Sequence, residues 1–124
     1  MIAALLFFVL TIAAPATVTP PTLLAQAEGP AVGEMVTIRA GCNDLDDLRA
    51  IVGAPSAEES KAATWRALTA GACWIGSWFS AVIDRVVEDL IDHDGDVVRI
   101  VRFQDPSDGQ VGFAAFVIAK ARKG

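Results

Sequence analysis

The stretch "DLIDHDGDVVRIVRF", residues 89–103, decides the fold class of this chain. It places an Asp94-Gly95 pair between two apolar runs, which is a strong signal for a β-hairpin. A tight turn of the primed type, with positive φ at both central residues, is the form that this pair favours. We therefore predict two antiparallel strands joined at Asp94-Gly95, with His93, the only histidine, as a turn residue.

The same stretch carries three aspartates at alternate positions, which raises the alternative of a metal-binding loop. Asp92, Asp94 and Asp96 have carboxylates that suit calcium. The calcium-binding helix-loop-helix pattern needs a Gly after its third acidic position and a bidentate Glu at its twelfth. Here Gly95 precedes the third aspartate, and the twelfth position counted from Asp92 is Phe103. We predict that the aspartates shape a turn and bind no metal.

Alternating apolar and polar residues extend the β pattern to both sides of this hairpin. The predicted strands lie near 36–40, 78–87, 97–104 and 111–118. Asp108-Gly109 lies between the last two of them and predicts a further turn. Residues 78–91 also fit a helical period, so helix stays open as an alternative there, although the β-branched content favours a strand.

A first helix is predicted near 44–52, directly after the first strand. Apolar residues recur there at helical spacing, and acidic residues load the first turn. Asn43 or Asp44 can cap its beginning, and Gly53 can end it.

A second helix is predicted near 57–70 and begins with a capping-box pattern, Ser56 followed by Glu59. Its C-terminal stop is Gly71, a residue type that favours the conformation needed after a helix end. Ala62, Trp65 and Leu68 recur at helical spacing, which predicts that they form the buried face and that Trp65 is a core anchor.

Together these patterns predict one mainly β domain with inserted helices, of the α+β class, over residues 35–124. We expect an antiparallel β-barrel of four to six strands. The two helices are expected between its first and second strands.

The front of the chain has the composition of a segment that directs export. Residues 1–27 hold no Asp, Glu, Lys or Arg, and their apolar run is too short to span a bilayer as a helix. We interpret 1–27 as a signal peptide, with "AQA" before Glu28 as the cleavage site and "APA" ending at Ala16 as the alternative. Residues 28–34 are a linker. The protein is expected to be periplasmic or secreted, without stable membrane insertion after cleavage.

The net charge of the chain limits the classes of ligand that it is expected to bind. The chain has 15 acidic and 10 basic side chains, a net charge of −5, which disfavours nucleic acid and anionic lipid as ligands.

The two cysteines, Cys42 and Cys73, predict a disulfide in an exported chain. On the loop-entropy model such a bridge contributes about 3–4 kcal/mol. Two cysteines and one histidine are a poor metal set, and we predict no cofactor.

Several short segments resemble the bacterial SH3-like family of small β-barrels. The similar pieces are "VTIRAG" (36–41), "LTAG" (68–71), "AVIDRVV" (81–87), "DGDVVRIVR" (94–102) and "DGQVGFA" (108–114). The resemblance implies an SH3-like barrel that binds cell-wall peptide or a protein partner and is not an enzyme. This chain departs from the family in its long segment between Gly41 and Leu68, and in Val97 or Val98 and Phe113 at positions that are aromatic there.

The sequence is compatible with three classes of function to different degrees. The first is an exported, non-catalytic binding module, for which Trp74 and Trp78, beside Gly76, are the candidate contact residues, unless both are core. The alternative is a small secreted inhibitor or immunity-type protein. A hydrolase is disfavoured because Ser77 and Ser80 have no histidine at a recognisable distance and the sequence holds no G-x-S-x-G motif.

Overall fold

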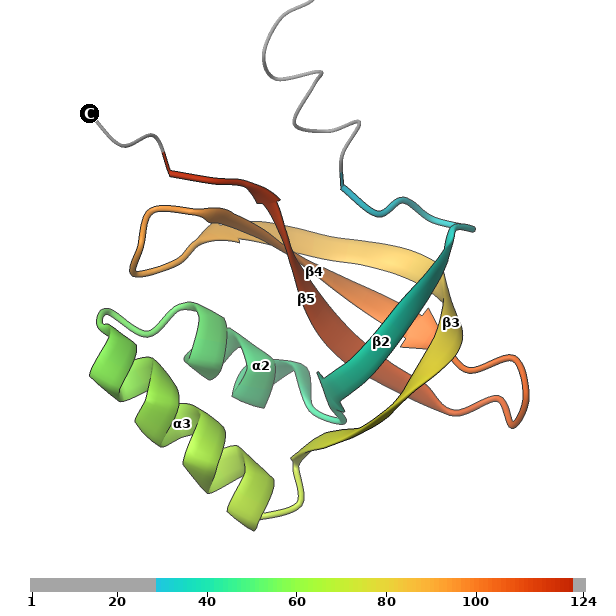
Figure 1. The fold of residues 1–124 in the computed structure, drawn as a ribbon, viewed down its shortest axis with the longest axis horizontal. Helices are drawn as coiled ribbons and strands as arrows, with labels where there is room; N and C mark the ends of the chain where they lie inside the picture. The colour runs from blue at the N-terminus through green and yellow to red at the C-terminus, as the bar shows by residue number, and fades with distance from the viewer. Residues whose placement is uncertain (1–28, 122–124) are drawn as a thin grey trace, which may run out of the picture.

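The structure is a computed structural model that describes residues 29–121. The predicted signal peptide and both of its cleavage sites lie outside the described residues. The elements, in chain order, are β2 (Met35–Cys42), α2 (Leu45–Val52), α3 (Ala57–Thr69), β3 (Cys73–Ile91), β4 (Val97–Gln104) and β5 (Val111–Ala119) (Figure 1). Each predicted strand and helix is present within two residues of its predicted bounds, except that β3 begins five residues before and ends four residues after the predicted 78–87.

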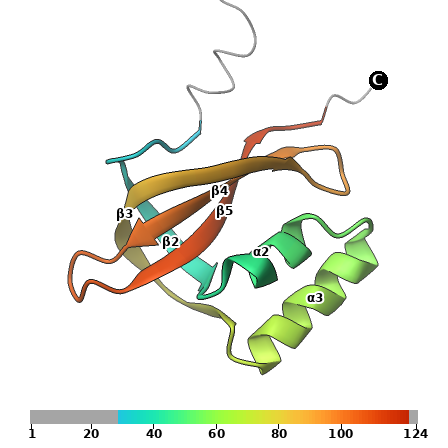
Figure 2. The ribbon, with the colours of Figure 1, turned by 180° about the vertical axis from the view of Figure 1, so that it is seen from behind.

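The four strands form a closed antiparallel sheet in the order β2-β3-β4-β5. The closure between the first and last strands is narrow, because β2 and β5 pair only at Cys42 and Phe113. The two helices lie between β2 and β3 in the chain and pack side by side below one end of the sheet (Figure 2). The prediction of a mainly β domain with inserted helices is confirmed.

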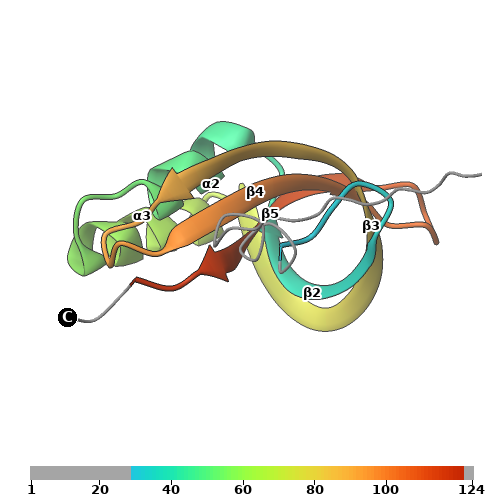
Figure 3. The ribbon, with the colours of Figure 1, turned by 90° about the horizontal axis from the view of Figure 1, so that it is seen from above.

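Strand β3 is long and curls, so that its first half pairs with β2 and its second half with β4 (Figure 3). Residues 78–91 are strand throughout, which resolves the helix alternative. Register shifts accompany the curl. Ile83 and Arg85 lie opposite Phe103 and Arg102, so Asp84 is one extra residue on β3. β-Bulges of this kind increase the local twist and bend the strand that carries them.

The hairpin between β3 and β4 is confirmed, but the primed turn is wrong. The Gly95 amide donates to the Asp92 carbonyl at 3.0 Å, and the Asp92 amide donates to the Asp96 carbonyl at 2.9 Å. Gly95 has φ 86°, and among the described residues no other type has positive φ. The loop is therefore a three-residue turn with glycine in the left-handed position, because a primed turn would have forced Asp94 there too.

Both helices begin at the predicted caps. The Asp44 side chain accepts from the Asp46 amide at 2.9 Å, so Asp44 and not Asn43 caps α2. Ser56 Oγ accepts from the Glu59 amide at 3.1 Å, which is one half of the predicted capping box. Helix α3 ends before Gly71, whose φ of 77° is the left-handed conformation that an ending glycine adopts.

The buried face of α3 differs from the prediction. Ala63 and Ala67 are its buried residues, whereas Trp65 is 71% exposed. Two alanines one turn apart let the helix approach its neighbours closely, and a tryptophan on that face would hold them apart. The expectation that Trp65 anchors the core was wrong.

Two hydrophobic clusters lie on opposite faces of the sheet. One fills the curl of the sheet and includes Ile83 and Phe103, and the other lies under the helices and includes Ile100. Strand β4 contributes to both clusters. Its adjacent residues Ile100 and Val101 are fully buried, Ile100 in the cluster under the helices and Val101 in the cluster within the curl. The extra residue at Asp84 also places Val86 on the same side as Ile83, although residues three apart in a regular strand lie on opposite faces.

The Cys42–Cys73 disulfide is present, which confirms the predicted pairing. Cys42 ends β2 and Cys73 begins β3, and the two residues are direct partners across the strands. The bridge therefore closes the base of the helical insertion, residues 43–72, where it leaves and rejoins the sheet.

Residues 29–34, the described part of the predicted linker, pack onto the sheet before β2 begins. The Gly33 amide donates to the Ile83 carbonyl at 2.7 Å, and Pro30 accepts from Arg99 at 3.3 Å. Within residues 29–121, no helix has the length and apolar character that crossing a membrane requires.

Candidate functional site

A bulge in the first half of β3 determines where Trp78 lies. Ile38 pairs with Phe79 and Ala40 pairs with Ile75, so two steps on β2 correspond to four steps on β3. The two extra residues fall among Gly76, Ser77 and Trp78, opposite Arg39. Glycine inside a strand commonly marks such a bulge. The bulge leaves Trp78 63% exposed on the surface of the sheet instead of pointing into a core.

Arg39 lies over this exposed tryptophan. The centre of its guanidinium is 5.7 Å from the centroid of the Trp78 ring, within the range of a cation–π contact. A guanidinium stacked in this way keeps the N–H groups on its edge available. Within residues 29–121, those N–H groups have no ion pair and no side-chain hydrogen bond. The two side chains thus form an exposed aromatic-cation pair.

Trp74, the other candidate contact residue, is half-buried and packs into the cluster within the curl. Its ring lies 5.6 Å from Phe79 and 6.2 Å from Phe103, centroid to centroid, with the latter pair edge to face. Such packing is worth about 0.5–1.5 kcal/mol beyond the area that it buries. Both tryptophans lie on β3 itself and not in a loop, and they differ in exposure because the bulge separates them.

Two adjoining clefts follow the line where β2 and β5 face each other. The first, of about 210 Å³, lies between this line and the helices, and Trp74, Ile75 and Leu68 line it. The second, of about 280 Å³, lies beside Trp78 and Arg39. The two clefts share three small residues, namely Ala40, Ala114 and Ala115. Their shared lining makes one continuous depression with a floor of small side chains.

A further hollow borders α3 near the first cleft. Thr64 lines the first cleft and also this hollow of about 420 Å³ beside Trp65. Each of the three hollows is bordered by an exposed apolar side chain, with Trp65 71%, Ile75 56% and Trp78 63% exposed. Apolar side chains gathered in this way mark interaction surfaces. We call this feature, from Trp65 through Ile75 to Trp78, the apolar strip.

Sequence reasoning identified one end of the apolar strip and missed the rest. Trp78 was predicted as a contact residue, whereas Ile75 was not singled out, Arg39 was predicted only as a strand residue, and Trp65 was assigned to the core. A signal for Ile75 was present in Gly76, which interrupts the alternation of the strand. No local pattern marks Arg39, because its partner comes from another strand.

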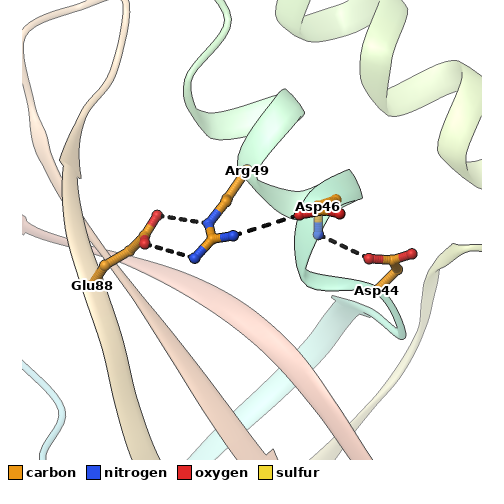
Figure 4. Close-up of polar contacts among 4 residues, drawn as sticks. All are labelled: Asp44, Asp46, Arg49 and Glu88. Carbon is orange, nitrogen blue, oxygen red and sulfur yellow. Dashed lines mark hydrogen bonds and ion pairs between the residues drawn. The ribbon is translucent and has the colours of Figure 1, made fainter.

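Ion pairs gather on the second half of β3, and one of them holds α2 there. Arg49 of α2 donates to both carboxylate oxygens of Glu88 on β3, at 3.0 Å from Nε and 2.9 Å from Nη2 (Figure 4). The same guanidinium reaches Asp46 at 3.5 Å. The hydrogen bond to Glu88 is the main reason that the pKa of Arg49 is raised, against the opposing effect of desolvation. This two-point contact fixes α2 to the second half of β3.

A second two-point contact joins β3 to β4. Arg99 donates to Asp89 at 2.9 Å from Nε and at 3.1 Å from Nη2. The hydrogen bond from Arg99 lowers the pKa of Asp89 below its ordinary value, and partial burial opposes it in part. These charges stabilise the fold and lie apart from the apolar strip.

The three aspartates of the β3–β4 turn come together, with a ligand atom of each within 4.8 Å of the others. Two of them are engaged by backbone amides. Asp92 Oδ1 accepts from the amides of Asp94 and Asp96, at 2.9 and 3.0 Å, and Asp96 Oδ1 accepts from the Ala121 amide at 2.6 Å. Their observed contacts are those of a turn and of an anchor for the end of β5.

Comparison with known proteins finds no match, whether with protein-family models, with curated proteins or with solved structures.

Proposed function

We propose that this protein is an exported, non-catalytic binding module that takes an extended peptide along the apolar strip. The observation that carries the proposal is Trp78, which a two-residue bulge holds on the surface next to a continuous cleft. An exposed tryptophan with a cation on one face offers a large contact area that loses little conformational entropy on binding. Bulges often re-aim a side chain in this way beside functional sites.

The lining of the cleft supports binding by shape and apolar contact. Its lining is mostly apolar and includes the methyl groups of three alanines together with Ile75, Leu68 and the Trp74 indole. The Thr64 hydroxyl in the lining already donates to the Ser60 carbonyl at 2.8 Å. Such a surface suits a ligand of alternating small and large apolar groups, as an extended peptide presents.

The ligand class that we propose is a cell-wall peptide or a peptide segment of a protein partner. The closed four-stranded sheet is consistent with the SH3-like barrel that the sequence resembles, and such barrels commonly bind peptides. The disulfide supports passage through an oxidising compartment and hence export, which is part of this proposal.

Two measurements test the proposal. Purified protein of residues 28–124 is sedimented with insoluble peptidoglycan, and in parallel it is used to capture partners from a periplasmic extract. We expect retention in one of the two assays, and we expect Trp78→Ala to abolish it. Acrylamide quenching with and without the retained ligand then reports the solvent exposure of the indole rings. Bound ligand should shield Trp78, while Trp74 stays protected throughout. Retention that Trp78→Ala leaves unchanged would contradict the site.

A secreted inhibitor or immunity-type protein is the second candidate function. Its support is the acidic charge of −5 in a disulfide-closed domain, which favours a basic enzyme as partner. The captured partner separates the two candidates. Loss of an enzyme's activity on binding would favour inhibition, and binding to wall peptide without an enzyme would favour the module.

A further inference from the structure

We call the line along which β2 and β5 face each other the seam. Along most of the seam the edges of these two strands are not paired with each other. The two strands pair at Cys42 and Phe113 alone, and beyond this point the residues of β5 pair only with β4 among the described residues. The cleft beside Trp78 lies between the separated strands, lined by 37–40 from β2 and 114–116 from β5. Backbone amides and carbonyls along this edge of β5 thus face a space with apolar walls.

The composition of β5 sets it apart from a protected edge strand. Its sequence "VGFAAFVIA" contains no charged residue and no proline. Proteins commonly guard free edges with lysine, proline or bulges, because unpaired edges accept a further strand. Val117 is 50% exposed, and Ala115 is exposed too. These features leave β5 open to a strand beside it.

Arg39 gives this seam a charge preference. It is the only charged residue among those that line the cleft beside Trp78 in the described part of the chain. The whole chain carries a net charge of −5, so a cation here stands against the general sign of the protein. Its guanidinium edge suits a carboxylate, which it can hold by paired hydrogen bonds.

We propose that the ligand is an extended peptide bearing a carboxylate that adds as a strand to the free edge of β5, residues 114–117. Its main chain pairs with β5, its carboxylate meets Arg39, and one apolar side chain rests on Trp78. This inference rests on the proposed function and deepens it, since main-chain pairing supplies affinity and the side-chain pockets supply selectivity.

The test uses a displayed library of random octapeptides, screened against protein of residues 28–124. We expect the enriched peptides to be rich in β-branched residues and to carry Asp or Glu at a constant position. The strongest peptide is then synthesised in three forms: unmodified, with its acidic residue replaced by the amide, and with alternate backbone nitrogens methylated. Titration calorimetry should show that each change weakens binding about tenfold or more, because a charged hydrogen bond or several ladder bonds are lost.

Matched variants locate the contact on the protein. Arg39→Gln should weaken the binding of the unmodified peptide about tenfold and should change the binding of the amide form little. Arg85→Gln removes the same charge from an exposed position on β3 and should leave the affinity unchanged. Hydrogen exchange followed by NMR should show new protection of amides within 114–117 on binding.

Each contrary result has a distinct meaning. Equal binding of the methylated peptide, or no new protection on β5, overturns strand addition, while dependence on Trp78 would still support the binding module. Failure to enrich any peptide overturns the strand proposal, and the peptidoglycan and capture assays decide the proposed function separately. If the protein dimerises without added peptide and its amides within 114–117 become protected, then a second copy of the chain occupies this edge. That result would overturn the proposal of a peptide ligand.

Discussion

The two halves of β3 have different compositions and different tasks. The first half, Cys73–Ile83, contains no charged residue. The second half, Asp84–Ile91, contains three acids, and each pairs with an arginine of another element. The pairs are Asp84 with Arg102 at 3.5 Å, Glu88 with Arg49 at 2.9 Å and Asp89 with Arg99 at 2.9 Å.

This difference teaches how one strand serves both stability and binding. The ion pairs tie the second half to β4 and α2, where a changed side chain affects the fold. The first half is held by its partner strand, by the disulfide at its start and by the buried residues near its end. The bulge in between leaves Ile75 and Trp78 outside either cluster, so these side chains can meet a ligand at small cost to the fold.

The largest effect is expected inside the first half itself, where burial changes sharply along the strand. Ile83 is fully buried, so Ile83→Ala should lower the free energy of unfolding by about 2–5 kcal/mol through lost contacts and a cavity. Ile75→Ala removes the same atoms from a side chain that is 56% exposed and should cost less than about 1 kcal/mol. Urea unfolding measures both, and equal losses would break the distinction between buried and binding residues.

Removal of the disulfide should come next. Replacing Cys42 and Cys73 together by alanine should lower the free energy of unfolding by about 3–4 kcal/mol, because the unfolded chain regains the freedom of the closed loop. Hydrogen exchange should show the greater loss of protection in residues 43–71, which the bridge ties to the sheet. The β3–β4 hairpin serves as the internal control. Uniform loss of protection would mean that insertion and sheet form one cooperative unit.

A smaller effect is expected from the second half. Asp89→Asn breaks the two-point contact with Arg99 and should cost about 1 kcal/mol at neutral pH, a modest value because the carboxylate is partly exposed. Asp84→Asn, whose ion pair is longer at 3.5 Å, is the matched control and should cost less.

The Asp89 contact also predicts a pH dependence. The folded-state pKa of Asp89 lies below its ordinary 3.8, so the folded protein holds fewer protons on it than the unfolded chain. The contribution is therefore complete above the unfolded pKa and is lost as the pH falls through the folded pKa. Urea unfolding between pH 7 and pH 2.5 should show the gap between wild type and Asp89→Asn closing only on the acid side. A gap of the same size at pH 2.5 as at pH 7 would contradict this assignment.

The smallest effect on stability is expected at Trp78. Trp78→Ala should change the free energy of unfolding by less than about 1 kcal/mol, since the side chain is 63% exposed, yet it should abolish binding. Trp78→Phe keeps an aromatic face and should retain part of the affinity. Thermal unfolding and titration of the retained ligand measure the two effects, and a large loss of stability would place Trp78 with the structural residues.

The sequence by itself determined the features that depend on neighbouring residues. The Asp94-Gly95 hairpin, the Asp44 and Ser56 caps and the stop at Gly71 could be predicted because each depends on the conformation of a few consecutive residues. The Cys42–Cys73 pair followed from the cysteine count. Even here the predicted turn type was wrong. The Asp92 carboxylate accepts from the amides of Asp94 and Asp96, and these contacts stabilise a different loop conformation.

Only the tertiary structure decided which side chains are buried and which face a ligand. Trp65 was assigned to the core because spacing alone shows that a helix has a face, but the packing of Ala63 and Ala67 decides which face is buried. Trp78 is exposed because the pairing of β3 with β2 contains extra residues, and the seam beside it exists because β5 meets β2 at one point. Such features arise from contacts between distant segments, on which the spacing of residues within one segment carries no information.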